Sequence, residues 1–167
     1  MKKKIIFSVF FLILILLFAY KAIFWVNPLI EDQKMALDGT LNMSISEMEH
    51  MEDVNSVLFG FDVLMYLSLL VVTGMLTFYK DISYLRYGGI TVMAVVVMLG
   101  VLSLFSFDTV FSWFHLVFFP QGNWQFAADS VLITTFPLEF FVEMSKRIFL
   151  FAFVLGGASV GISLKKW

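Results

Sequence analysis

Four long runs of apolar residues, separated by more polar segments, set the pattern of the chain. They cover about residues 5–26, 57–78, 90–107 and 148–164, and Lys21 is the only charged residue inside the first run. A helix needs roughly 20 apolar residues to cross the hydrocarbon layer, and a helix satisfies every backbone hydrogen bond of such a segment internally. The pattern therefore predicts an all-α membrane protein, a four-transmembrane-helix bundle forming a single domain over residues 1–167.

The two long segments between these runs, 27–56 and 108–147, are predicted to carry short helical or re-entrant pieces. In the first, residues 44–55 are expected to form a helix leading into the second span, because Ser44 and Glu47 have the spacing of a capping box. In the second, residues 111–126 read FSWFHLVFFPQGNWQF. This stretch is too aromatic for a solvated loop, so it predicts a segment at the membrane interface or re-entering the membrane.

Charged residues indicate the orientation of the helices across the membrane. The positive-inside rule makes the side with the basic residues cytoplasmic, which places both termini inside and the two long segments outside. An uncleaved first span is favoured over a signal peptide, because the apolar run is long and no small-residue cleavage site follows it. Lys146 and Arg147 are basic residues on the predicted outer side, at the start of the fourth span. Glu143 has the spacing to pair with both of them. The residues on the cytoplasmic side are Lys2, Lys3, Lys4, Lys80, Arg86, Lys165 and Lys166.

Composition then excludes several classes of protein. Sixty per cent of the residues are hydrophobic and only 14% are charged, which is unlike a soluble domain. The 11 Lys and Arg against 13 Asp and Glu provide no basic excess for nucleic acid, and the lack of cysteine excludes disulfide frameworks and thiol nucleophiles. No glycine-rich phosphate-binding motif is present, so no nucleotide is expected. Any chemistry is therefore predicted at the outer leaflet of the membrane.

The chain has two histidines, and both fall in the outer segments next to the ends of spans. His50 shares a helical face with Asp53, three residues later, and neighbours Glu49. A carboxylate beside an imidazole raises its basicity and fixes its tautomer, as acid–base catalysis requires. A solvated charged face is the alternative interpretation of the same residues.

His115 lies within the aromatic stretch, between Phe114 and Leu116. An imidazole near membrane depth is costly and indicates a functional site, although a packed imidazole satisfied by a backbone carbonyl would explain it equally well. Asn123 and Trp124 add a side-chain amide and an indole N–H, which could stabilise an oxyanion or simply close the turn.

Taken together, these segments resemble the lipoprotein intramolecular transacylase family, which consists of small four-span membrane proteins of Gram-positive bacteria. The resemblance covers the whole topology, and the chain departs from the family pattern at Glu52 and Asn55. It is specific in two blocks, Glu49-His50-Met51 with Asp53-Val54, and Phe114-His115 with Phe118-Phe119, Asn123-Trp124, Asp129, Leu132-Ile133, Phe136-Pro137 and Glu139-Phe140-Phe141.

The resemblance implies an acyltransferase that needs no cofactor and no metal. Its substrate would be the diacylglyceryl-cysteine of a lipoprotein embedded in membrane lipid, and its product the lyso form, in which the sn-2 acyl chain has moved to the α-amine of the same cysteine. His50 and His115 are the candidate base and acid, either for direct attack by the amine or through an acyl-imidazole. Asp53 or Glu49 would orient His50, while the Asn123 and Trp124 side chains would contact the oxyanion or the substrate.

Two other classes of function remain open at the level of sequence. His50, Asp53 and His115 could hold zinc in a membrane hydrolase, which a chelator would inactivate. The chain could also be a non-enzymatic scaffold or immunity-type protein, which would tolerate replacement of both histidines.

Overall fold

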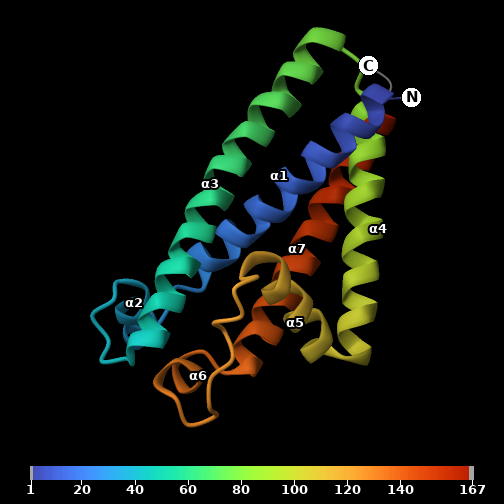
Figure 1. Ribbon diagram of the computed structural model, residues 1–167. Coiled ribbons are helices and arrows are strands. Elements are labelled where there is room, and N and C mark those ends of the chain that lie inside the picture. The colour runs from blue at the N-terminus through green and yellow to red at the C-terminus, as the bar shows by residue number, and fades with distance from the viewer. Residues whose placement is uncertain (1, 166–167) are drawn as a thin grey trace.

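The computed structural model describes residues 2–165, and within that range the regular elements are all helices (Figure 1). Four of the helices are long and apolar enough to cross a membrane, which confirms the predicted all-helical, four-span architecture. Lys166, one of the basic residues counted on the cytoplasmic side, lies outside the described range. The elements in order are α1 (Lys2–Val26), α2 (Glu31–Leu37), α3 (Ile45–Tyr79), α4 (Ser83–Phe105), α5 (Phe107–Phe118), α6 (Val131–Thr135) and α7 (Leu138–Leu164).

Helix α3 is much longer than a membrane crossing requires. Its 35 residues span about 52 Å at the usual rise per residue, against a hydrocarbon layer of about 30 Å. Its N-terminal part therefore projects beyond the second apolar run. That part begins with the capping box that the sequence predicts, in which Ser44 accepts a hydrogen bond from the Glu47 N–H and the Glu47 side chain bonds back to the Ser44 backbone.

Helix α7 begins earlier than its hydrophobicity indicates. The fourth apolar run starts at about 148, whereas the helix starts at Leu138, directly after Pro137. Polar residues interrupt the apolar pattern here without breaking the helix, because Glu143 and Arg147 form an ion pair one turn apart, with Nε 2.9 Å from Oε1. The first part of α7 therefore lies within the second outer segment that the sequence predicts, 108–147.

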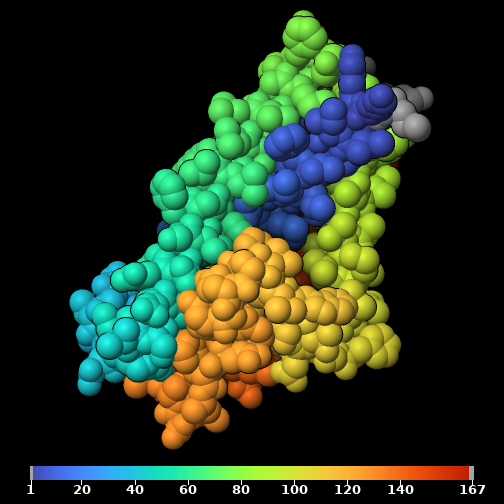
Figure 2. Space-filling model, in the orientation of Figure 1, coloured from blue at the N-terminus to red at the C-terminus, as the bar shows by residue number. Residues whose placement is uncertain are grey.

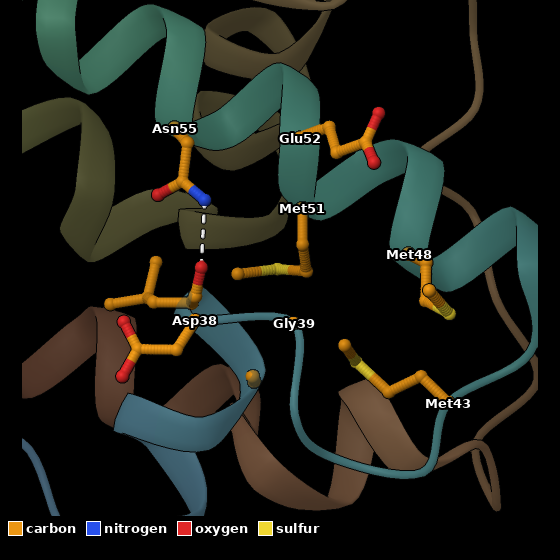
Figure 3. Close-up of a pocket in the computed structure, with 9 residues that line it drawn as sticks. Asp38, Gly39, Met43, Met48, Met51, Glu52 and Asn55 are labelled. Carbon is orange, nitrogen blue, oxygen red and sulfur yellow. Dashed lines mark hydrogen bonds between the residues drawn. The ribbon is translucent and has the colours of Figure 1, made fainter.

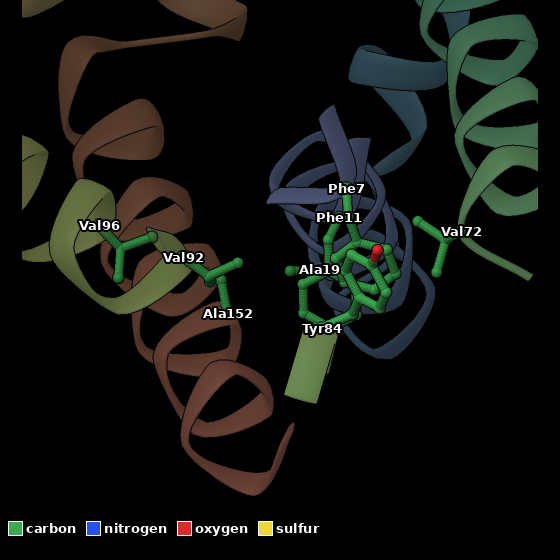
Figure 4. Packing of buried hydrophobic residues seen from close by; sticks show 8 residues of the cluster. All are labelled: Phe7, Phe11, Ala19, Val72, Tyr84, Val92, Val96 and Ala152. Carbon is green, nitrogen blue, oxygen red and sulfur yellow. The ribbon is translucent and has the colours of Figure 1, made fainter. Parts of the chain in front are cut away.

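Helices α1, α4 and α7 pack against one another, and α3 packs against α1 (Figure 1). The start of α1 and the end of α7 lie at the same end of the bundle (Figure 1). Buried apolar side chains fill the interfaces, as Figure 4 shows; they are Phe7, Phe11, Ala19, Val72, Tyr84, Val92, Val96 and Ala152. Helices α4 and α7 approach most closely at two glycines. A Cβ atom on Gly89 would lie 2.5 Å from the carbonyl oxygen of Gly156.

Replacing Gly89 with alanine is expected to destabilise the bundle, because the added methyl group meets backbone that cannot move without separating α4 from α7. Overpacking of this kind costs about 1–3 kcal/mol. Thermal unfolding of the purified protein in detergent measures the effect. Gly157→Ala is the matched control, since a Cβ atom there meets nothing within 4 Å. Equal unfolding midpoints for the two variants would contradict the close α4–α7 contact.

Helix α5 lies at the end of the bundle away from the start of α1 and the end of α7 (Figure 1). Ser106 caps it by accepting a hydrogen bond from the Thr109 N–H. The outward side exposes Trp113, Leu116 and Val117, all large and apolar. An exposed apolar side is what a helix lying in the membrane interface needs. In Figure 2 the gold and orange atoms of α5, α6 and their connection pack against the teal N-terminal part of α3.

Candidate active site

The structure brings the two histidines face to face from different elements. His50 lies on the projecting part of α3 and His115 on α5, and their ring centroids are 6.3 Å apart with planes inclined by 25°. Both side chains are buried, with 6% and 7% of their surface exposed. Aromatic rings pack around the pair, among them Phe119, Phe126 and Trp124.

His115 is held in one tautomer by the backbone of its own helix. Its Nδ1 lies 2.8 Å from the carbonyl oxygen of Phe111, which can only accept, so Nδ1 carries the proton. The Nε2 atom of the neutral ring is then left with a free lone pair. Burial lowers the pKa of His115 below its usual value, and the bond to the Phe111 carbonyl opposes this shift only in part. The ring is therefore neutral at pH 7 and able to accept a proton.

His50 sits in an apolar environment with weak polar support. Its ring packs against Phe119 at 4.8 Å and Phe126 at 5.7 Å between centroids. Burial lowers the pKa of His50, proximity to His115 lowers it further, and hydrogen bonding by Asn123 and the charge of Asp53 act in the opposite direction. Asn123 is thus near enough to influence the ring. However, His50 Nδ1 and Asn123 Oδ1 are both buried without a partner in good hydrogen-bond geometry among residues 2–165.

Asp53 does not bond to His50 directly, contrary to the simplest reading of its spacing. Its Oδ2 atom instead accepts hydrogen bonds from Gln121 Nε2 and Asn123 Nδ2, each at 2.7 Å. One helical turn beyond His50, Asp53 faces the turn after α5, where Gly122 has φ +80°. Between Asp53 and His50 the structure therefore shows proximity of charge and no direct hydrogen bond. The Asn123 amide, expected to contact the oxyanion or the substrate, donates one of its two N–H groups to Asp53.

Gln121 is a site residue that sequence reasoning missed. It lies in the Pro120-Gln121-Gly122-Asn123 interruption, whose turn composition was visible but whose partner was not. Its bond to Asp53 joins the turn after α5 to α3 across 68 positions of sequence. This bond and that of Asn123 hold the two histidine-bearing elements together.

Glu49 and Trp124 occupy very different positions. The Glu49 side chain is exposed and makes no hydrogen bond within the described part of the chain, so nothing in the structure supports its orienting His50. Trp124 is half-buried and packs against His115 with ring centroids 4.7 Å apart. Its indole N–H has no hydrogen-bond partner among the described residues. Trp124 therefore remains a candidate donor beside the imidazole pair.

Glu47 does more than cap α3. It is only 4% exposed, and its Oε1 atom accepts a hydrogen bond from the Leu132 N–H at 2.8 Å, which attaches α6 to α3. Burial works to raise the pKa of Glu47, but hydrogen bonds from Leu132 and from Ser44 outweigh it and hold the pKa below its ordinary value. The carboxylate thus stays charged and fixes the outer segment beside the histidines.

Metal binding finds no support in this arrangement. Within residues 2–165, no three His, Cys, Asp or Glu side chains are grouped so that they could hold a metal ion, and this includes the His50, Asp53 and His115 set considered from sequence. Met43 and Met51 pack into a small apolar cluster with Leu132, as expected of adaptable packing.

A pocket of about 140 Å³ lies between α2 and another face of α3 (Figure 3). Neither histidine lines it. Glu52 stands at this pocket, and Asn55 Nδ2 donates to the Leu37 carbonyl at 2.8 Å, tying α2 to α3. The two positions at which the chain departs from the family pattern thus lie away from the imidazole pair. The lining residues are Ala36, Leu37, Asp38, Gly39, Met43, Met48, Met51, Glu52 and Asn55.

Comparison with known proteins identifies relatives in sequence and in fold. The model of the family "Lipoprotein intramolecular transacylase Lit" matches residues 17–141, which contain every site residue above. An uncharacterized protein of Aquifex aeolicus (strain VF5) is 28% identical over 111 residues, covering 66% of this chain and 51% of the relative, so the chain matches about half the length of that protein.

Two solved structures share the fold. The membrane-integral lipoprotein intramolecular transacylase of Bacillus cereus has a TM-score of 0.77 at 18% identity, over 95% of this chain and 91% of that one. A structure of the same Bacillus cereus protein with a histidine-to-arginine mutation has a TM-score of 0.70 at 18% identity, over 96% and 88% of the two chains.

Proposed function

Because this chain belongs to the lipoprotein intramolecular transacylase family, we propose that it moves the sn-2 acyl chain of a lipoprotein's diacylglyceryl-cysteine to the α-amine of that cysteine. The product is the lyso form, with one amide-linked and one ester-linked chain. The observation that carries the proposal is the approach of His50 and His115 to 6.3 Å from separate elements. Burial and proximity of the two imidazoles support an acid–base pair over the alternative of an exposed charged face.

The reaction requires proton transfer and no external energy. The neutral amine attacks the ester carbonyl, an N–C bond forms, the C–O bond to glycerol breaks, and the amine proton ends on the glycerol oxygen. We assign proton acceptance to His115, because its Nδ1 is occupied by the Phe111 carbonyl and its Nε2 is free. The imidazole pair then returns that proton to the leaving oxygen. Direct attack suits a nucleophile and an ester that are tethered in one lipid.

Trp124 and the second N–H of Asn123 are the candidates for stabilising the tetrahedral oxyanion, and the Trp124 ring packs directly against His115. Asp53, Asn123 and Gln121 serve as positioning residues, which hold the turn after α5 against α3.

The proposal also includes the orientation of the protein in the membrane. The start of α1 and the end of α7 lie at one end of the bundle, and α5 with its histidine lies at the other (Figure 1). Since basic residues gather at the first end, we place it in the cytoplasm and the imidazole pair at the outer leaflet. There the exposed apolar side of α5 meets lipid. The acyl chains of the substrate approach sideways, from the bilayer.

The test is to express the full chain in a bacterium that makes diacylglyceryl lipoproteins and to fragment the N-terminal peptide of a reporter lipoprotein by mass spectrometry. An intramolecular shift leaves the total mass unchanged while one acyl chain becomes amide-linked. A peptide that keeps both acyl chains ester-linked and its α-amine free would support a scaffold protein. A gain in mass by one acyl chain would show transfer from another molecule, and either result overturns the proposal.

A further inference from the structure

Two residues of opposite charge lie away from the histidines, within the apolar runs of α1 and α3. Lys21 of α1 and Asp62 of α3 form an ion pair, with Nζ 2.6 Å from Oδ1 and 2.9 Å from Oδ2. Charged residues within membrane-spanning helices are rare and costly, so such a pair calls for a functional explanation. The proposed reaction does not use it, because Asp62 follows His50 by twelve residues, about 18 Å along the helix.

The ion pair lies at the contact that attaches α3 to the other spans. Helices α1, α4 and α7 each pack against the other two, whereas α3 packs against α1 among the spans. Apolar side chains also contribute to the α1–α3 contact, with Val72 and Met75 packed into the cluster of Phe7 and Phe11. Near the other end of the two helices, Lys3 lies over the ring of Tyr79. Smooth apolar surfaces tolerate sliding and rotation, while a single polar contact in such an interface selects one register.

We propose that Lys21 and Asp62 are positioning residues that set the register of α3 on α1 and thereby the distance between His50 and His115. His50 moves with α3, whereas His115 lies on α5, which packs against α4. A slip of α3 by one residue moves His50 by about 1.5 Å and turns it by about 100°. Since a misplacement of about 1 Å is enough to cost about 100-fold in rate, the register controls turnover.

A contact close to Asp62 reports this register independently of activity. Phe61 of α3 meets Phe118 of α5 with ring centroids 5.1 Å apart. The chain contains no cysteine, so Phe61→Cys with Phe118→Cys introduces the only two thiols. The yield of cross-linking by a short bifunctional thiol reagent in lipid nanodiscs then measures the alignment of α3 and α5.

The experiment compares Lys21→Met, Asp62→Leu and the reversed pair Lys21→Asp with Asp62→Lys, each in the wild-type and the two-thiol background. We expect each single variant to lower the cross-link yield at least threefold and to lower kcat about tenfold or more per folded molecule, with little change in KM. The reversed pair is expected to recover most of both. Lys34→Met is the control, because Lys34 pairs with Glu31 on exposed α2, and it should change neither quantity.

Unchanged cross-linking and kcat in the single variants, or failure of the reversed pair to recover either quantity while it folds, would overturn the register role. The inference about kcat rests on the proposed transacylase function, but the cross-link yield does not. If the wild-type chain lacks transacylase activity while the single variants still lose cross-linking, the proposed function fails and the register role stands.

Discussion

Replacing His115 with alanine is expected to reduce formation of the amide-linked product by about 10²–10⁴-fold, the range typical of a lost acid–base group. The reason lies in the local geometry. The Phe111 carbonyl fixes the proton on Nδ1 and leaves Nε2 free, and burial keeps the ring neutral at pH 7 by lowering its pKa. No other described side chain offers a free imidazole nitrogen at this place except His50, which belongs to the same pair.

The loss must be separated from unfolding, because His115 is buried and packs against Phe111 and Trp124. The unfolding midpoint of His115→Ala in detergent gives the folded fraction, to which the rate is normalised. Leu116→Ala is the matched control, since that side chain is 59% exposed on the outward side of the same helix. It should retain wild-type rates. Wild-type turnover per folded molecule in His115→Ala would remove this histidine from the mechanism.

The architecture was predictable because membrane helices are specified locally. Each span needs only its own apolar residues, and its backbone bonds close within the segment. The helix at residues 44–55 was equally local, since Ser44 and Glu47 satisfy each other three residues apart. The start of α7 was not predicted, because hydrophobicity falls at Glu143, Lys146 and Arg147. The ion pair that carries the helix through this stretch contributes nothing to an apolar pattern.

The two histidines could be nominated from sequence because an imidazole among apolar residues is costly wherever the chain folds. The hydrogen bonds around them could not be predicted from sequence. Asp53 has the spacing to face His50, yet its oxygen accepts from Gln121 and Asn123, which arrive from a turn that only the folded outer segment brings near. The same applies to Glu47, whose capping role is local but whose bond to the Leu132 N–H depends on the docking of α6.

These longer-range bonds explain why the site lies at the end of the bundle and not within it. Inside the membrane, α3 meets the other spans through α1. Beyond its apolar run, the N-terminal part of α3 is tied to α6 and to the turn after α5 through the carboxylates of Glu47 and Asp53. The imidazole pair therefore sits where a polar, hydrogen-bonded scaffold adjoins the apolar helices.

Replacing His50 with alanine is expected to lower the yield of lyso product by about 10²-fold or more, because the leaving glycerol oxygen then lacks its proton relay. Asp53→Asn should have a smaller effect, about tenfold. Asp53 raises the pKa of His50 by its charge, so the neutral amide lowers the fraction of His50 that is protonated and moves any His50-dependent step to lower pH. The measurement is the lyso product formed per folded molecule as a function of pH.

The double variant distinguishes a shared role from two separate ones. If Asp53 acts through His50, then His50→Ala with Asp53→Asn should be no slower than His50→Ala alone, since residues that act as a unit are not additive. Independent effects would multiply to about 10³-fold. Glu49→Gln is the matched control on the same helix, because the Glu49 side chain is exposed and unbonded within the described chain, and it should leave the rate unchanged. If the two effects multiply, Asp53 does not act through His50, and its role is to connect α3 to the turn after α5.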